Sequence, residues 1–143
     1  MKKILLIISL CFCINYCNAQ VSISLSKLNG TKWTIDDEEK IGEDTTQYFN
    51  SFTQFSAYLP LIKKRAKFQT PYYLTDSIPR TFDSSKVGQS QHGCYIVKYN
   101  DVMDVMTVFK IQEFDLQKGK MVLYNPRIKD AFRDGTIKYR LIK

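Results

Sequence analysis

Short segments in which apolar and polar residues alternate recur along the chain, and they limit its fold more than any other feature. An alternation of period two is typical of strands that bury one face and expose the other. In the first such segment, serines alternate with Val21, Ile23 and Leu25. In the last, basic residues alternate with Ile137, Tyr139 and Leu141. We find no convincing long helix, so the pattern predicts an all-β antiparallel sandwich or barrel.

Further strands are predicted in the second half of the chain. The segment 94–99 sets Tyr95, Val97 and Tyr99 on one face, and in 106–114 we expect the odd-numbered residues to face the core. Asn100-Asp101 and Lys118-Gly119 supply turns on either side of 106–114. Strands over 71–75 and 121–124 complete this part of the sheet.

Residues 46–66 support two interpretations. A helical stripe is formed by residues spaced three and four apart: Tyr48, Phe52, Phe55, Leu59 and Ile62. The composition disagrees, because threonines and aromatic residues favour strands and Pro60 would interrupt a helix. We favour two short strands, and we interpret the basic run Lys63-Lys64-Arg65 as a charged turn rather than a phosphate or membrane patch.

The first nineteen residues resemble an export signal. Two lysines precede a short apolar run over 4–14, and small residues at Cys17 and Ala19 suit cleavage before Gln20. The run is too short to span a bilayer as a helix. We therefore expect a signal peptide over 1–19, a single domain over 20–143, and a secreted or periplasmic protein that is not an integral membrane protein.

Composition then excludes several classes of function. Removing 1–19 takes two lysines and lowers the net charge from +7 to +5. The remaining basic residues form no continuous stripe, and export removes the usual substrate, so we expect no nucleic-acid partner. Cys94 is then the only cysteine and His92 is the only histidine in the chain. We therefore expect no intramolecular disulfide, no metal site and no cofactor.

Several sequence blocks resemble small secreted bacterial lipocalin-like proteins, a calycin-type family. They are Gly30-Thr31-Lys32-Trp33, residues 72–79, residues 82–88 and residues 139–143, and the usual Gly-x-Trp of the family is one residue longer here. The resemblance implies an up-and-down barrel of about eight strands, open at one end. It also implies a structural closure in which the guanidinium of Arg140 lies over the indole of Trp33.

A barrel of this kind has an interior that is either a ligand cavity or filled by its own side chains. We expect a non-catalytic protein that binds a small apolar or amphipathic ligand in the cavity. The expected lining is Tyr95, Val97, Tyr99, Phe109, Ile111, Leu123 and Tyr139. The alternative is a filled barrel that acts through its surface as an envelope interaction module or an inhibitor.

Catalytic and cation-binding interpretations receive little support from the sequence. His92 and Cys94 share a strand face at a spacing of two, but no third group or oxyanion motif accompanies them, so we expect no enzyme. The acidic run 36–39 and the pair Asp101 and Asp104 lack the spacing of a calcium loop, and we interpret both as solvated loops.

Overall fold

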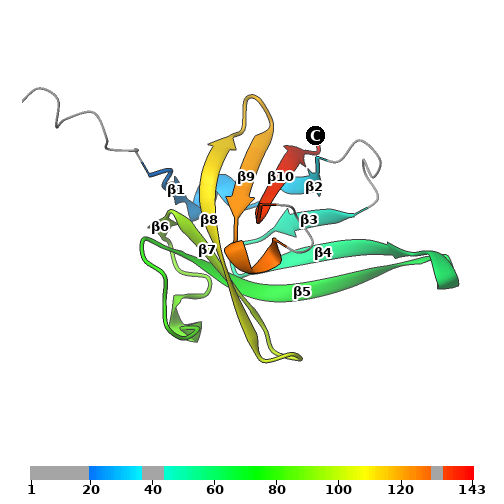
Figure 1. The fold of residues 1–143 in the computed structure, drawn as a ribbon, viewed down its shortest axis with the longest axis horizontal. Coiled ribbons are helices and arrows are strands. Elements are labelled where there is room, and N and C mark those ends of the chain that lie inside the picture. Colours follow the sequence, from blue (N-terminus) through cyan, green and yellow to red (C-terminus); the bar gives the residue numbers. More distant parts are fainter. Residues whose placement is uncertain (1–19, 37–43, 130–133) are drawn as a thin grey trace, which may run out of the picture.

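The protein is an all-β molecule built around a closed barrel of eight antiparallel strands (Figure 1). A computed structural model describes residues 20–36, 44–129 and 134–143. The expected signal peptide and most of the acidic run lie outside the described residues. The predicted fold class, an up-and-down barrel of about eight strands, is confirmed.

The barrel order is β10-β2-β3-β4-β5-β7-β8-β9, with β10 closing onto both β2 and β9. The barrel strands are β2 (Lys32–Ile35), β3 (Thr45–Tyr48), β4 (Phe52–Leu59), β5 (Lys64–Thr75), β7 (Tyr95–Asn100), β8 (Val105–Asp115), β9 (Lys120–Tyr124) and β10 (Thr136–Leu141). Two short strands, β1 (Ile23–Ser24) and β6 (His92–Gly93), pair outside the barrel. The short helical elements are α2 (Leu25–Leu28), η1 (Pro60–Ile62), η2 (Ser84–Lys86) and η3 (Pro126–Ile128).

The preference for strands over 46–66 is confirmed. β3 ends at Tyr48, and β4 pairs along its whole length with β5, from Phe52 opposite Pro71 to Leu59 opposite Lys64. Cross-strand pairing stabilises this aromatic and threonine-rich sequence better than a helix would. The basic run begins at the tip of the hairpin, where Lys63 has a positive φ of 52°.

The core fills the end of the barrel that α2 covers. Leu25 and Leu28 of α2 pack with Trp33, Tyr72 and other buried side chains. The tips of the β4–β5 and β7–β8 hairpins lie at the other end, and the β4–β5 hairpin projects well beyond the barrel (Figure 1). The molecule therefore has one closed end and one end marked by projecting hairpins.

The alternation expected in 106–114 holds as far as a bulge in β8. Phe109 and Ile111 belong to or pack on the core, as expected. The register between β8 and β9 then shifts between Ile111 and Glu113. A bulge adds one unpaired residue and reverses the faces beyond it, so Phe114, an even-numbered residue, packs on the core.

Candidate functional site

A cavity of about 180 Å³ lies inside the barrel toward its open end. Its lining combines aromatic rings, three threonines, an aspartate and a lysine: Trp33, Ile35, Asp44, Thr46, Thr53, Phe55, Thr70, Lys98 and Tyr139. A cavity of about 150 Å³ holds a ring the size of benzene. The space therefore fits a small group, and its threonines and ionisable side chains favour a polar one.

Lys98 projects into this interior from β7. Its ammonium nitrogen lies 5.3 Å from the ring centroid of Tyr48 and 5.7 Å from that of Phe109. Among the described residues, none forms an ion pair with Lys98. Burial lowers the pKa of Lys98 to about 8, because an ammonium ion loses hydration inside the barrel. Among the described residues, the contacts of this cation are therefore with two ring faces.

The hydroxyl of Tyr48 adds a second polar group without a partner. Tyr48 is 1% exposed, and its oxygen has no hydrogen-bond partner among the described residues. Tyr72, packed edge-on against it at 5.5 Å, donates its own hydroxyl to the carbonyl of Phe49 at 2.7 Å. Burial, together with the neighbouring Tyr139 and Tyr72, raises the pKa of Tyr48. Its hydroxyl therefore stays protonated and can donate a hydrogen bond.

Asp44 and Tyr139 complete the ionisable groups near the cavity. The Asp44 carboxylate accepts a hydrogen bond from the backbone N–H of Tyr58 at 3.2 Å. Burial raises the pKa of Tyr139 to about 12, so its phenol is neutral at physiological pH. The site therefore combines one ammonium group, two phenolic hydroxyls and, on the same lining, the carboxylate of Asp44.

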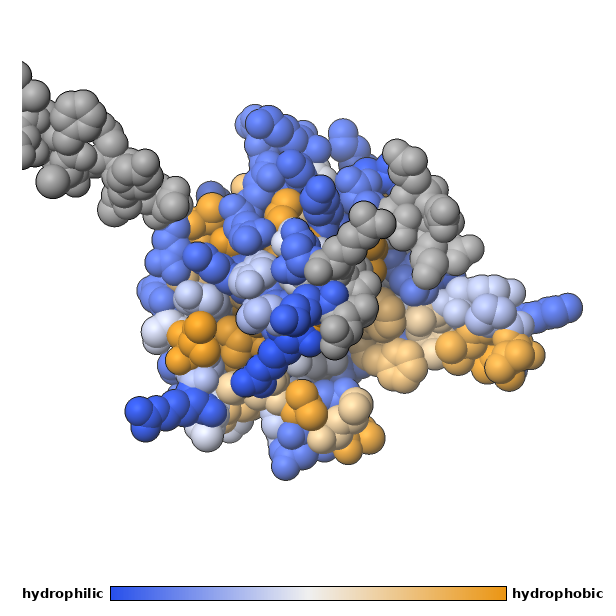
Figure 2. Space-filling model, viewed as in Figure 1, coloured by the Kyte–Doolittle hydropathy of each residue, from blue (hydrophilic) through white to orange (hydrophobic). Residues whose placement is uncertain are grey.

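An apolar path leads out of the cavity along the β4–β5 hairpin. Phe55 lines the cavity, and its ring stacks on that of Phe68 at 6.5 Å. These rings are 36% and 53% exposed, and the next cross-strand pair on the same face is Ala57 with Ala66. Figure 2 shows hydrophobic atoms gathered along this projecting hairpin. The mouth of the site is thus apolar although its interior is polar.

Four of the seven expected lining residues face the interior. Ile111 and Leu123 are core residues, and Phe109 and Tyr139 pack against the core. Of these four, Tyr139 lines the cavity and Phe109 contacts Lys98, whereas Ile111 and Leu123 belong to the filled closed end.

The other three expected lining residues, Tyr95, Val97 and Tyr99, face away from the interior, so the orientation expected for β7 is wrong. Ile96 belongs to the core and Lys98 lines the cavity, which puts the odd-numbered residues of β7 on the outer face. That face is also covered: Tyr99 stacks on Phe82 at 5.0 Å. Val97 is fully buried on this outer face, where Phe82 packs on the neighbouring Tyr73 and Tyr99, so apolarity alone did not distinguish the two faces.

The expected contact between Trp33 and Arg140 is also wrong. Trp33 is fully buried, as expected, and its indole N–H donates to the hydroxyl of Thr31 at 2.8 Å. Leu141 pairs opposite Trp33, whereas Arg140 pairs opposite Thr34 and is exposed. Neighbours across a sheet share a face, so Arg140 lies on the outer side of the barrel.

Sequence reasoning missed Lys98 and Tyr48. Alternation assigned Lys98 to the solvent face, because a lysine on a strand is most often exposed. The pairing of β7 with the aromatic residues of β5 would have placed Lys98 on the inner face. Tyr72 pairs opposite Lys98, so an inward Tyr72 requires an inward lysine.

His92 and Cys94 differ sharply in environment. His92 is exposed, whereas the buried thiol of Cys94 lies 3.5 Å from the carbonyl oxygen of Asp76. Burial, with the negative charge of Asp76, raises the pKa of Cys94. A nucleophilic cysteine needs a lowered thiol pKa, so this environment favours the thiol over the reactive thiolate.

In comparisons with known proteins, no family model, no curated protein and no solved structure matches the chain. The closed barrel of eight antiparallel strands is compatible with a calycin-type fold. In the described part of the chain, no helix has both the length and the apolar character needed to cross a membrane.

Proposed function

We propose that the protein is a non-catalytic, lipocalin-like binding protein for a small amphipathic anion, exported by its first nineteen residues. The observation that carries this proposal is Lys98, a cation beside an interior cavity with no ion-pair partner among the described residues. A buried charge is costly unless it is paired. A ligand carboxylate would supply the missing partner.

The remaining contacts suggest how the ligand would lie. Its carboxylate would meet the ammonium of Lys98, and the hydroxyl of Tyr48 would donate a hydrogen bond in the same region. Its apolar part would extend over Phe55 and Phe68 at the mouth. The cavity is too small for a long chain to be fully enclosed, so part of the ligand would lie along the hairpin.

Trp33 provides the readout for a direct test. It is the only tryptophan in the chain and it lines the cavity, so its fluorescence reports on cavity occupancy. We would titrate the protein at neutral pH with decanoate and, in parallel, with decanol. Decanoate should bind and change the emission, and decanol should bind at least about tenfold more weakly because it lacks the charge.

Variants assign the effect to the site. Lys98→Met should remove the preference for decanoate over decanol, whereas Lys110→Met, an exposed lysine on β8, should keep it. Equal affinity for the two ligands in the wild type, or an unchanged preference in Lys98→Met, would refute the proposal.

The filled-barrel alternative has one observation in its favour. Apolar side chains are strongly exposed at two hairpin tips: Leu61, Ile62, Val102 and Met103. Exposed apolar groups of this kind can mark a contact surface. Native mass spectrometry of the exported protein distinguishes the two, since a small-molecule adduct that is lost on unfolding supports the cavity and a protein adduct supports the surface.

A further inference from the structure

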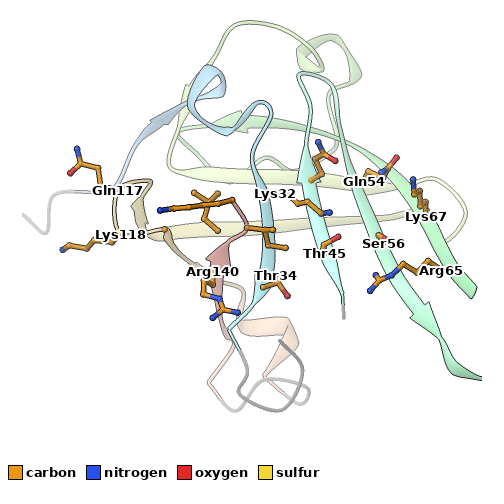
Figure 3. Close-up of a pocket in the computed structure, with 15 residues that line it drawn as sticks. Lys32, Thr34, Thr45, Gln54, Ser56, Arg65, Lys67, Gln117, Lys118 and Arg140 are labelled. Atoms are coloured by element: carbon orange, nitrogen blue, oxygen red, sulfur yellow. The ribbon is translucent and has the colours of Figure 1, made fainter. Parts of the chain in front are cut away.

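A second hollow, of about 930 Å³, lies on the outer surface of the barrel (Figure 3). Its floor is formed by β2 and β3. One side is formed by the β4–β5 hairpin, and the other by the β8–β9 turn and the chain end at 141–143. We call this hollow the outer groove. Its floor residues alternate with Trp33, Thr46 and other inward-facing residues, so it is separate from the interior cavity.

The strand register arranges the polar side chains of the outer groove in two rows. In the first row, Ser56 pairs opposite Thr45 and Thr45 opposite Thr34. Thr34 and Thr45 are 2% and 7% exposed and form the deep part of the groove, where the Thr34 hydroxyl donates to the carbonyl of Asp44 at 2.9 Å. In the neighbouring row, Gln54 pairs opposite Gln47. The floor is therefore a surface of hydroxyl and amide groups.

Cations stand at both ends of the hydroxyl row. Lys67 pairs opposite Ser56 on one side, and Arg140 pairs opposite Thr34 on the other. Four strand spacings separate these two residues, which corresponds to about 19 Å across the sheet. Lys32, Arg65 and Lys143 add to the same lining, and no Asp or Glu belongs to it among the residues that the structure describes.

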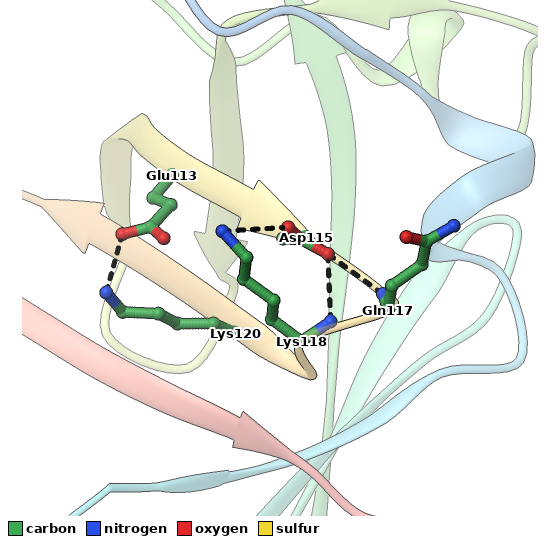
Figure 4. Close-up of polar contacts among 5 residues, drawn as sticks. All are labelled: Glu113, Asp115, Gln117, Lys118 and Lys120. Atoms are coloured by element: carbon green, nitrogen blue, oxygen red, sulfur yellow. Dashed lines mark hydrogen bonds and ion pairs between the residues drawn. The ribbon is translucent and has the colours of Figure 1, made fainter.

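The β8–β9 turn that borders the groove is held in place by its own polar contacts (Figure 4). The Asp115 carboxylate accepts hydrogen bonds from the backbone N–H groups of Gln117 and Lys118, each at 2.9 Å. It also pairs with the Lys118 ammonium at 3.8 Å, and Glu113 pairs with Lys120 at 2.8 Å. Lys118 is thus already engaged, and we assign the charge that a ligand would meet in the groove to Lys32, Lys67, Arg140 and Lys143.

The chemistry of the outer groove selects among anionic ligands. Cations about 19 Å apart favour an extended ligand with repeated charges over a single ion. Amides and hydroxyls between the cations match the hydroxyl groups of sugars. No aromatic ring lines the groove among the described residues, so unpaired bases would find nothing to stack on. We propose that the outer groove binds an acidic polysaccharide, with its carboxylate or sulfate groups on Lys67 and Arg140 and its sugar hydroxyls on the polar floor.

The test is a calorimetric titration of the purified protein with four probes. These are an oligogalacturonate, a heparin oligosaccharide of similar length, a neutral maltodextrin and a single-stranded DNA oligonucleotide. At least one acidic oligosaccharide should bind, with an affinity that falls as NaCl is raised. The maltodextrin should not bind, and the DNA should bind more weakly. The better of the two acidic probes identifies the charged group as carboxylate or sulfate.

Two double variants of equal charge locate the binding surface. Lys67→Gln/Arg140→Gln removes both ends of the row and should weaken binding by about tenfold, with a smaller salt dependence. Lys27→Gln/Lys110→Gln removes two exposed lysines outside the groove and should change affinity by less than about twofold. Gln47→Ala/Gln54→Ala should weaken binding while leaving the salt dependence unchanged, because no charge is lost.

Three outcomes would overturn the proposal. They are no binding of either acidic oligosaccharide, equal weakening by both lysine-containing double variants, and DNA binding as tight as that of the oligosaccharides. The Lys98→Met variant should bind these probes normally, so the result is independent of whether the interior cavity binds a ligand.

Discussion

Lys98 lies inside the barrel against the faces of two aromatic rings, and it forms no ion pair with any described residue. Ring faces compensate only part of the hydration that an ammonium group loses on burial. The residue therefore lowers the stability of the free protein at neutral pH. Such a group is retained at the expense of stability when it has a role in binding, which is the basis of the proposed function.

Replacing Lys98 with methionine should stabilise the free protein near pH 7. The folded pKa of about 8 lies below the ordinary lysine value of 10.5, so the folded state binds fewer protons than the unfolded state between these two values. The penalty is complete below pH 8 and disappears as pH rises toward 10.5, so the wild type gains stability over that range, by up to about 3 kcal/mol.

Urea denaturation of both proteins at pH 7 and pH 10 measures this difference. The advantage of Lys98→Met should be large at pH 7 and small at pH 10. Taking the difference between the two proteins cancels the ionisation of tyrosines, which both contain. A constant or growing advantage would show that the lysine is not desolvated.

Tyr48 and Tyr72 provide a matched pair of phenols with opposite expected effects. Tyr48→Phe removes a buried hydroxyl that has no partner among the described residues, and it should stabilise the free protein by about 1 kcal/mol. Tyr72→Phe removes a hydrogen bond to the carbonyl of Phe49 and should destabilise it by about the same amount. Thermal or urea denaturation checks both, and a destabilised Tyr48→Phe would mean that its hydroxyl is satisfied in solution.

At the scale of the elements, β6 lies against the end of β5 with no room for a side chain at Gly93. A Cβ atom at Gly93 would meet the backbone of Thr75, with the carbonyl oxygen at 2.5 Å. The backbone cannot give way as a flexible side chain would. Only glycine therefore lets the strand β6 lie against β5 at this point.

Gly93→Ala should destabilise the fold by about 3 kcal/mol because the two strands must separate. Gly30→Ala is the control: its φ is +82°, and nothing lies within 4 Å of the added atom. It should cost only the backbone strain of about 1 kcal/mol. If urea denaturation shows that Gly93→Ala costs no more than Gly30→Ala, the close approach to Thr75 does not constrain the fold as described.

The sequence predicts the strands well and their orientation less well, and β7 shows why. Alternation identifies 94–99 as a strand, but Ile96 and Val97 are both fully buried, one by the barrel interior and the other from outside. A strand covered on both faces carries no inside-outside signal. The final strand is exposed on one face, and there the expected inward set of Ile137, Tyr139 and Leu141 agrees with the core packing.

The candidate site is harder to predict than the fold for a related reason. Composition favours an apolar cavity lined by aromatic residues, whereas the actual lining includes three threonines, a carboxylate and an ammonium group. Polar residues inside a barrel become visible only when the register of all strands is known. The β-bulge in β8 shifts the register, and the covered outer face of β7 hides which of its residues point inward.

At the scale of the whole molecule, the barrel wall separates two surfaces of different chemistry. Within the described residues, the interior has an ammonium group without an ion-pair partner, next to phenols and the Asp44 carboxylate, and an apolar mouth. The outer groove has several basic side chains around hydroxyls and amides. Because adjacent residues on β2, β3 and β4 face opposite sides, the two proposed sites can be altered separately by substitutions.

The most direct test of the interior site is an NMR titration of the Lys98 side chain, with and without decanoate. In the free protein its pKa should lie near 8, well below the ordinary lysine value of 10.5. Bound decanoate should raise that pKa by more than about one unit, since a carboxylate nearby favours the charged form. An ordinary pKa near 10.5 in the free protein, unchanged by decanoate, would contradict an unpaired cation poised to bind an anion.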